Sequence, residues 1–259
     1  MTKMNSFKNN KTMKTIAKIK LMSFAVVLIA TLFALQGCNL ACSRNAVKGD
    51  GNVLTVNYDV YDFKSIDIRG MFNVILAQGE KEQVVLETDG NLHELISVDV
   101  KDNKLIIKTT KEKFINPTKM NLYIYFKEIN VISSGGACTI SATSCIDAQY
   151  LSIDLSGATE INLELKINEL TTNASGASNI NFSGNANTHN IALSGAGKIK
   201  ADNLFTNSTN IRLSGAGSAY VHADEYLDAK ISGVGSVYYA GDPDKKNIEK
   251  SGLGSVSKI

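Results

Sequence analysis

Ser194-Gly195-Ala196-Gly197 is one copy of a four-residue motif that recurs along the second half of the chain. The copies begin at Ser134-Gly135, Ser156-Gly157, Ser175-Gly176, Ser194-Gly195, Ser214-Gly215, Ser232-Gly233 and Ser251-Gly252. Successive motif serines are separated by 22, 19, 19, 20, 18 and 19 residues. A period of this length is typical of a solenoid, in which each repeat forms one turn and stacks on its neighbours.

The residues that follow each motif indicate that the repeating unit is a strand. The fifth residue after the motif serine is aliphatic in six of seven copies, in the order Thr139, Ile161, Ile180, Ile199, Ala219, Val237 and Val256. The seventh residue is often large, as in Leu163, Phe182, Val221 and Tyr239. Both positions share one face of a strand, because alternate side chains point the same way. A leucine-rich repeat would need a leucine ladder, which is not kept.

The sequence therefore predicts an all-β fold: a single-stranded parallel β-helix, right-handed, with about 18–20 residues per turn. One turn cannot bury its own apolar face, whereas turns stacked at about 4.8 Å share a continuous core. The motif glycines are interpreted as corners where neighbouring turns approach closely. A phosphate-binding loop is the weaker interpretation, because such loops precede a helix and carry Lys or a GxGxxG spacing.

Residues 1–37 have the features of a lipoprotein signal peptide. Six lysines in the first twenty residues precede the apolar run Leu21–Leu35, which is shorter than the roughly 20 residues of a membrane span. The run ends in Leu35-Gln36-Gly37-Cys38, which resembles a lipoprotein cleavage site, so Cys38 is predicted to receive the lipid. The alternatives are a plain secreted protein or a single anchor helix, and Met13 is an alternative start to Met1.

The remaining chain is divided by its composition. Residues 38–52 are small, polar and charged without periodicity, and are predicted to form a flexible tether. Residues 53–259 are predicted to be one β-helix domain. Its first part, 53–130, is strand-rich but less regular, with short apolar-alternating runs between turn residues. Its second part, 131–259, contains the regular Ser-Gly turns.

Several classes of function lack support in the sequence. From Cys38 onward the chain has 21 basic and 25 acidic residues, so nucleic acid is not an expected partner. His93, His189 and His222 share no position in the repeat, so neither a metal site nor a cofactor is predicted. Cys138 and Cys145 either pair in an oxidising envelope or remain as buried thiols.

Several segments together resemble a known family. They are the leader, the run FKSIDIRGMFNV at Phe63–Val74, the SGAG and SGVG turns, and Gly241-Asp242-Pro243 ahead of the final SGLGSV. They resemble the family named Putative auto-transporter adhesin, head GIN domain, over Val53–Ile259. The resemblance implies a parallel β-helix in the bacterial envelope without enzyme activity, and no catalytic residues are carried over. The turns SGGACT, SGATEI and SGASNI depart from the pattern, because they lack the second glycine of the SGAG form.

The predicted function is a non-catalytic cell-envelope lipoprotein that acts as a scaffold or adhesin-like interaction module. Its expected contacts are the membrane through the lipid, a glycan or an envelope protein, and a second copy through end-to-end association at open strand edges. Tyr220, Tyr226 and Tyr238 are the candidate binding surface, with Tyr239 pointing inward. A periplasm-facing position is expected, because no acidic cluster follows Cys38.

The alternative function is a polysaccharide-acting β-helix enzyme, either a lyase or a hydrolase. Such an enzyme needs clustered acidic side chains on one face of the solenoid. The column two residues before each motif serine reads Ile132, Asp154, Asn173, Ala192, Arg212, Lys230 and Glu249. This mixed column is typical of a solvated face, so no catalytic residue is predicted.

Overall fold

The computed structural model describes residues 46–110 and 114–259, which fall into two units. In the smaller unit, β1 (Val47–Lys48) pairs in parallel with β7 (Ile115–Asn116), and the Val47 N–H donates to the Phe114 carbonyl at 2.8 Å. Cys38 and the predicted signal peptide lie outside the described residues. No helix in the described ranges is long and apolar enough to cross a membrane.

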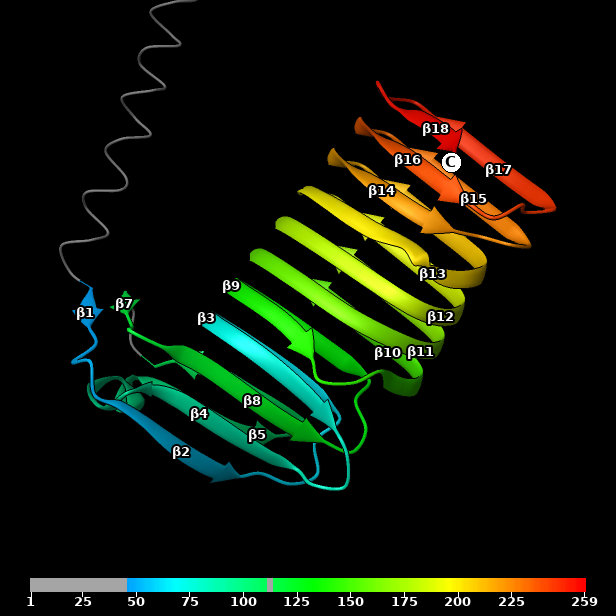
Figure 1. The fold of residues 1–259 in the computed structure, drawn as a ribbon. Coiled ribbons are helices and arrows are strands. Elements are labelled where there is room, and N and C mark those ends of the chain that lie inside the picture. Colours follow the sequence, from blue (N-terminus) through cyan, green and yellow to red (C-terminus); the bar gives the residue numbers. More distant parts are fainter. Residues whose placement is uncertain (1–45, 111–113) are drawn as a thin grey trace, which may run out of the picture. The chain divides into compact units, whose positions relative to one another are not determined.

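The larger unit is a parallel β-solenoid of about 7 turns (Figure 1). Its regular part consists of β9 (Val131–Ala142), β10 (Ile146–Leu155), β11 (Ala158–Ala174), β12 (Ala177–Leu193), β13 (Ala196–Leu213), β14 (Ala216–His222), β15 (Tyr226–Ile231), β16 (Val234–Ala240), β17 (Lys245–Lys250) and β18 (Ser255–Lys258). Each strand pairs in parallel with strands of the neighbouring turns. The predicted parallel β-helix is confirmed.

Equivalent residues of successive turns lie side by side in register. The fifth-position column runs through Ile161, Ile180, Ile199, Ala219, Val237 and Val256. From Ile161 to Val237 its members are at most 2% exposed. This column is therefore part of the solenoid core, as the strand periodicity predicts.

The first motif is displaced by one residue relative to the others. Ser134 pairs with Leu155, so Gly135 occupies the position that serines hold in later turns. Gly136, rather than Gly135, lies in the column of motif glycines. The shift also brings Ile140 opposite Ile161. It explains why Thr139 interrupts the aliphatic column when the sequence is aligned on Ser134.

The motif glycines stack so closely that no side chain fits between them. A Cβ atom at Gly157, Gly176 or Gly195 would lie 1.9, 2.0 or 2.0 Å from the carbonyl oxygen of the glycine one turn earlier. Contacts this short are impossible, and they involve backbone, which cannot rotate away. The corner therefore requires glycine because the neighbouring turn is too close for any side chain.

Chain order is broken in the first part of the solenoid. The long strand β3 (Ser65–Gln78) pairs in parallel with β9 on one side. On its other side it pairs in parallel with β6 (Lys104–Thr109) and β8 (Met120–Phe126). A turn formed early in the sequence thus lies between two later ones. This inserted turn is the reason residues 53–130 lack the regular period.

Antiparallel strands close the stack beyond β6 and β8. Strand β4 (Gln83–Asp89) pairs antiparallel with both β8 and β2 (Val53–Asp59), and β5 (Ile96–Lys101) pairs antiparallel with β6. A 3₁₀ helix, η1 (Gly90–Leu95), joins β4 to β5 and buries Leu92 and Leu95. This end of the core is therefore covered by additional secondary structure, as solenoid ends require.

Asp89 fastens the segment that precedes β2 to this cap. Its buried carboxylate accepts hydrogen bonds from the Gly51 N–H at 2.8 Å and the Thr118 N–H at 2.7 Å. Burial by itself would raise the pKa of Asp89, but the hydrogen bonds hold that pKa below its usual value. Residues 49–52, which the sequence assigns to the tether, are therefore bound to the folded domain.

The opposite end of the core is protected by lysines. In the last turn, Lys246, Lys250 and Lys258 occupy the columns of Leu227, Ile231 and Tyr239, which are buried in the turn before. A lysine here can lay its aliphatic stem over the core and keep its ammonium group in water. Inward-placed charges are a known protection of exposed strand edges against pairing with another chain.

The glycine column yields a stability prediction. Replacing Gly195 with Ala should lower the free energy of unfolding by at least about 3 kcal/mol, because the added Cβ forces two turns apart. Gly79→Ala is the matched control: no atom lies within 4 Å of its added Cβ, so a change within about 0.5 kcal/mol is expected. Urea denaturation measures both variants, and equal stability would contradict the role of the column.

The lysine end yields a prediction about association. Replacing Lys246, Lys250 and Lys258 together with Leu should increase end-to-end self-association, because it leaves an apolar core end beside unpaired strand edges. Lys245→Leu is the control, since Lys245 lies in the outward column of Tyr226. Light scattering at several concentrations measures the mass. A triple variant with the mass of the wild type at all concentrations would refute the protective role.

Candidate functional site

At the Ser-Gly edge, the amide of the motif serine and the amide two residues later are engaged in stacking. The Ser175 N–H donates to the Leu155 carbonyl at 2.9 Å, and the Ala177 N–H donates to the Gly157 carbonyl at 3.0 Å. These amides are consequently not available to cradle a phosphate, which supports the interpretation of the motif as a structural corner.

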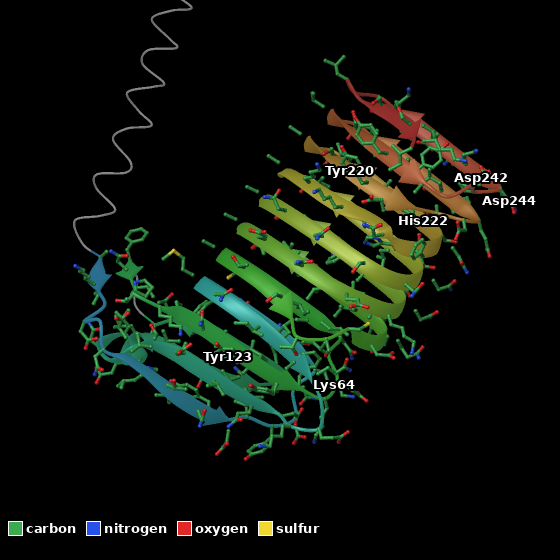
Figure 2. All side chains as sticks on the ribbon, in the orientation of Figure 1. Lys64, Tyr123, Tyr220, His222, Asp242 and Asp244 are labelled. Carbon is green, nitrogen blue, oxygen red and sulfur yellow. The ribbon has the colours of Figure 1, made fainter. Side chains whose placement is uncertain are left out.

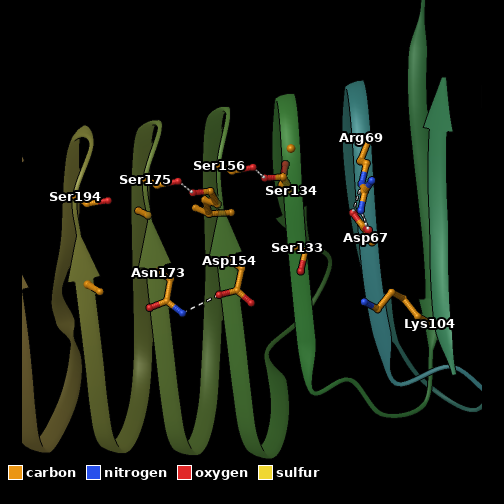
Figure 3. A pocket seen from close by; sticks show the side chains of 14 residues that line it. Asp67, Arg69, Lys104, Ser133, Ser134, Asp154, Ser156, Asn173, Ser175 and Ser194 are labelled. Atoms are coloured by element: carbon orange, nitrogen blue, oxygen red, sulfur yellow. Dashed lines mark hydrogen bonds and ion pairs between the residues drawn. The ribbon is translucent and has the colours of Figure 1, made fainter. Parts of the chain in front are cut away.

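The hydroxyl groups of the motif are more accessible. Ser156 and Ser175 are exposed, and their Oγ atoms donate to the carbonyls of Ser134 and Leu155 at 3.2 and 3.4 Å (Figure 3). The motif serines of the later turns are exposed as well. The edge therefore presents a line of hydroxyls with one group per turn.

An open groove of about 640 Å³ runs along this serine edge (Figure 3). At one end Arg69 donates to Asp67 from Nε at 3.1 Å and from Nη2 at 2.7 Å. Two turns on, Asn173 donates to Asp154 at 2.7 Å. Of the charged side chains in this lining, Arg69 and Asp67 thus form an ion pair and Asp154 is bonded by a neutral amide, while Lys104 also lines the groove.

The register corrects the column that the sequence assigned to this face. Asp154 pairs with Ser133, not Ile132, and Ser133 pairs with Asp67. Asp67 and Asp154 are therefore two strand spacings apart, about 10 Å. Both carboxylates are occupied by intramolecular hydrogen bonds. This arrangement resembles structural ion pairing more than a pair of acid and base catalysts.

Two of the three predicted tyrosines meet on the outer surface. Tyr220 of β14, labelled in Figure 2, pairs in register with Tyr238 of β16, and their rings stack with centroids 4.7 Å apart and planes inclined by 18°. The Lys198 Nζ lies 4.8 Å from the Tyr220 ring centroid. We call Lys198, Tyr220 and Tyr238 the tyrosine stack. Both tyrosine residues are half-buried.

The structure separates the other tyrosines from this stack. Tyr239 is 8% exposed and points into the core, as predicted from its alternation with Tyr238. Tyr226 begins β15 and pairs with Ser208 and Lys245, on a different strand row from β14 and β16. Lys198 was not identified from the sequence. Its position one residue before Ile199 of the core column predicts only that it points outward.

The histidines and cysteines of residues 46–110 and 114–259 lie at separate positions. His189 is buried, with Nε2 3.0 Å from the Thr172 hydroxyl, and His222 contacts Asp224 at 2.9 Å. Cys138 and Cys145 are free thiols, and burial raises the pKa of each. Within the described residues no group of three or more His, Cys, Asp or Glu side chains is placed to hold a metal ion.

These features define a β-solenoid protein that presents shallow grooves and an aromatic cluster on its outer faces. The family model described as Putative auto-transporter adhesin, head GIN domain matches residues 62–243. The chain belongs to this family.

Solved structures share the fold. A putative adhesin from Bacteroides fragilis is 28% identical with a TM-score of 0.80, covering 83% of this chain and 100% of that one. A putative adhesin from Parabacteroides merdae is 24% identical with a TM-score of 0.65, covering 83% and 99%. A putative lipid binding protein from Parabacteroides distasonis is 20% identical with a TM-score of 0.68, covering 83% and 99%. No curated protein matches the chain.

The buried His189 yields a prediction about pH. Burial lowers the pKa of His189 from 6.5 to about 3, so below pH 6.5 the unfolded chain takes up a proton that the folded chain refuses. The contribution of His189 to the free energy of unfolding has its full value above pH 6.5. It falls by up to about 1.4 kcal/mol per pH unit as the pH is lowered towards 3. His189→Asn lacks this titration while keeping a polar group near Thr172.

Urea denaturation of both proteins at pH 7, 6 and 5 measures the effect. The difference in unfolding free energy between wild type and His189→Asn should shrink by about 1 kcal/mol or more between pH 6 and pH 5. Both proteins contain the same carboxylates, so the effect of carboxylate titration on the unfolding free energy cancels in the difference between them. Parallel curves for the two proteins would exclude His189 as an acid-sensitive group.

Proposed function

We propose that the protein is a non-catalytic, adhesin-like binding module of the cell envelope, held to the membrane by a lipid on Cys38 and facing the periplasm. The leader sequence that ends in Gly37-Cys38 supports the anchor. Membership of a family named for adhesins supports the envelope role. The solenoid then acts as a rigid spacer that displays its outer faces.

The tyrosine stack is the observation that carries the binding proposal. Two tyrosine rings and a lysine are gathered on one outer face, although neither the core nor the corners require them there. Tyrosine contributes strongly to binding, because it offers an apolar ring and a hydroxyl at little conformational cost. A lysine beside the rings adds a positive charge for a polar partner such as an envelope glycan or protein.

The enzyme alternative gains no specific support. The serine-edge groove contains Asp67 and Asp154, but Arg69 and Asn173 hold them through hydrogen bonds. A carboxylate in such an arrangement is fixed by its partner and contributes to the structure. We therefore place binding, rather than bond cleavage, on the outer surface.

Binding of the intact chain to isolated cell envelopes tests the proposal. Beads coated with Tyr238→Ala should bind at least about tenfold more weakly than wild-type beads, a loss of about 1.4 kcal/mol. Tyr226→Ala is the matched control, because Tyr226 lies outside the stack. Treatment of the envelopes with periodate or with protease distinguishes a glycan partner from a protein partner. Equal binding by wild type and Tyr238→Ala would refute the role of the stack.

A further inference from the structure

The lining of a second groove shares no residue with the serine motif or the tyrosine stack. It has a volume of about 590 Å³. Its lining residues are Asp147, Ala148, Gln149, Lys166, Ile167, Asn168, Asn185, Ala186, Asn187, Phe205, Asn207 and Asp224. Five of the twelve side chains are polar and uncharged, three are charged, and one is an aromatic ring.

The lining is formed by two outward rows that cross successive turns. One row runs through Asp147, Lys166, Asn185 and Phe205, which pair in register. The other runs through Gln149, Asn168, Asn187 and Asn207, two residues further along each strand. All eight are exposed. The second row therefore repeats a side-chain amide at about 4.8 Å intervals, the spacing between turns, whereas the first row changes from charged to polar to aromatic.

Phe205 closes one end of this groove. Its side chain is 54% exposed, although Phe is a residue that proteins usually bury. The ring stands edge-on to His222, which is labelled in Figure 2, with centroids 5.0 Å apart, and His222 in turn contacts Asp224. After the pair Asn181–Lys200, the register between β12 and β13 shifts, and β13 has one additional residue before Phe205. The shift places Phe205 in the outward row of Asn185.

Two of the three charged side chains in the groove form a pair, because Lys166 contacts Asp147 at 2.8 Å. Asp224 contacts the His222 imidazole at 2.9 Å, so the lining holds one more carboxylate than ammonium groups. The Asp147 N–H donates to the Gln78 side chain at 2.8 Å, which fixes the backbone at this end. A groove lined in this way disfavours an anionic ligand.

The amide row leaves hydrogen-bonding capacity for a ligand. Asn207 donates to the Asn187 oxygen at 3.0 Å, so the two amides hold each other in place. Each asparagine has two donors and an oxygen with two lone pairs, and one shared bond leaves most of them free. Ordered amides offer donors and acceptors together, which suits a ligand that carries hydroxyl and acetamido groups.

We propose that this groove binds a neutral polysaccharide strand that carries acetamido groups. The C–H face of a sugar ring is slightly positive and stacks on the negative face of Phe205. The hydroxyl and acetamido groups bond to Asn187, Asn207 and the amides of neighbouring turns. A polymer fits better than a single sugar, because each further unit meets an equivalent polar row. The site is independent of the tyrosine stack.

Titration calorimetry of the intact chain with three β-1,4-linked hexasaccharides tests the proposal. They are the hexamers of N-acetylglucosamine, of glucose and of glucosamine. The acetylated hexamer should bind at least about tenfold more tightly than the other two, because only it combines acetamido groups with zero charge. Tighter binding of the cationic or the plain glucose hexamer would overturn the assignment, as would binding of none of the three.

Variants locate the binding in the groove. Phe205→Ala should weaken binding of the acetylated hexamer about tenfold or more, whereas Phe205→Tyr should restore it, because both rings offer a stacking face. Asn187→Ala should weaken it about fivefold. Tyr150→Ala is the matched control, since Tyr150 is 56% exposed and lies outside the groove lining. Thermal unfolding verifies that each variant is folded.

Tyr238→Ala separates this proposal from the function of the tyrosine stack. It should leave binding of the acetylated hexamer unchanged, even where binding to cell envelopes is lost. Unchanged binding by Phe205→Ala would refute the groove as the saccharide site. Binding of an extended asparagine-rich peptide in place of all three sugars would assign the groove to polypeptide and would equally refute the proposal.

Discussion

The close contact between stacked glycines at the Ser-Gly corner is the constraint on which the solenoid depends. At Gly157, Gly176 and Gly195 the carbonyl of one turn occupies the place where a side chain of the next would begin. Only this approach keeps the strands on both sides of the corner within hydrogen-bonding distance. The core columns and the outward rows have the same spacing as the stacked turns, because each turn is hydrogen-bonded to the preceding turn along most of its length.

A stack of similar turns has two open ends, and in this protein different features are found at each end. At the first end, antiparallel strands and a 3₁₀ helix cover the core, and Asp89 ties the preceding segment to them. At the second end, the last turn keeps the strand pattern but replaces buried apolar residues with Lys246, Lys250 and Lys258. Additional structure at one end and inward-column charges at the other are both ways by which proteins limit contact of an open strand edge with another chain.

The outer faces carry the features that the fold does not need. The tyrosine stack arises because two outward positions of adjacent turns hold the same residue type, and pairing in register places their rings 4.7 Å apart. Phe205 is exposed because its turn contains one additional residue before it. A solenoid allows such changes at low cost, since outward residues contact mainly their own row and leave the core unaffected.

The sequence by itself determined the fold class, the inward columns and the location of the corners. These follow from the alternation of side chains along a strand and from a period that repeats seven times, which are both local properties. It also identified Tyr238 as outward and Tyr239 as inward. The tertiary structure alone decided the displacement at Ser134 and the insertion of β3 between β8 and β9. It likewise decided which tyrosines meet and that Lys198 joins them, because these depend on pairing between strands distant in sequence.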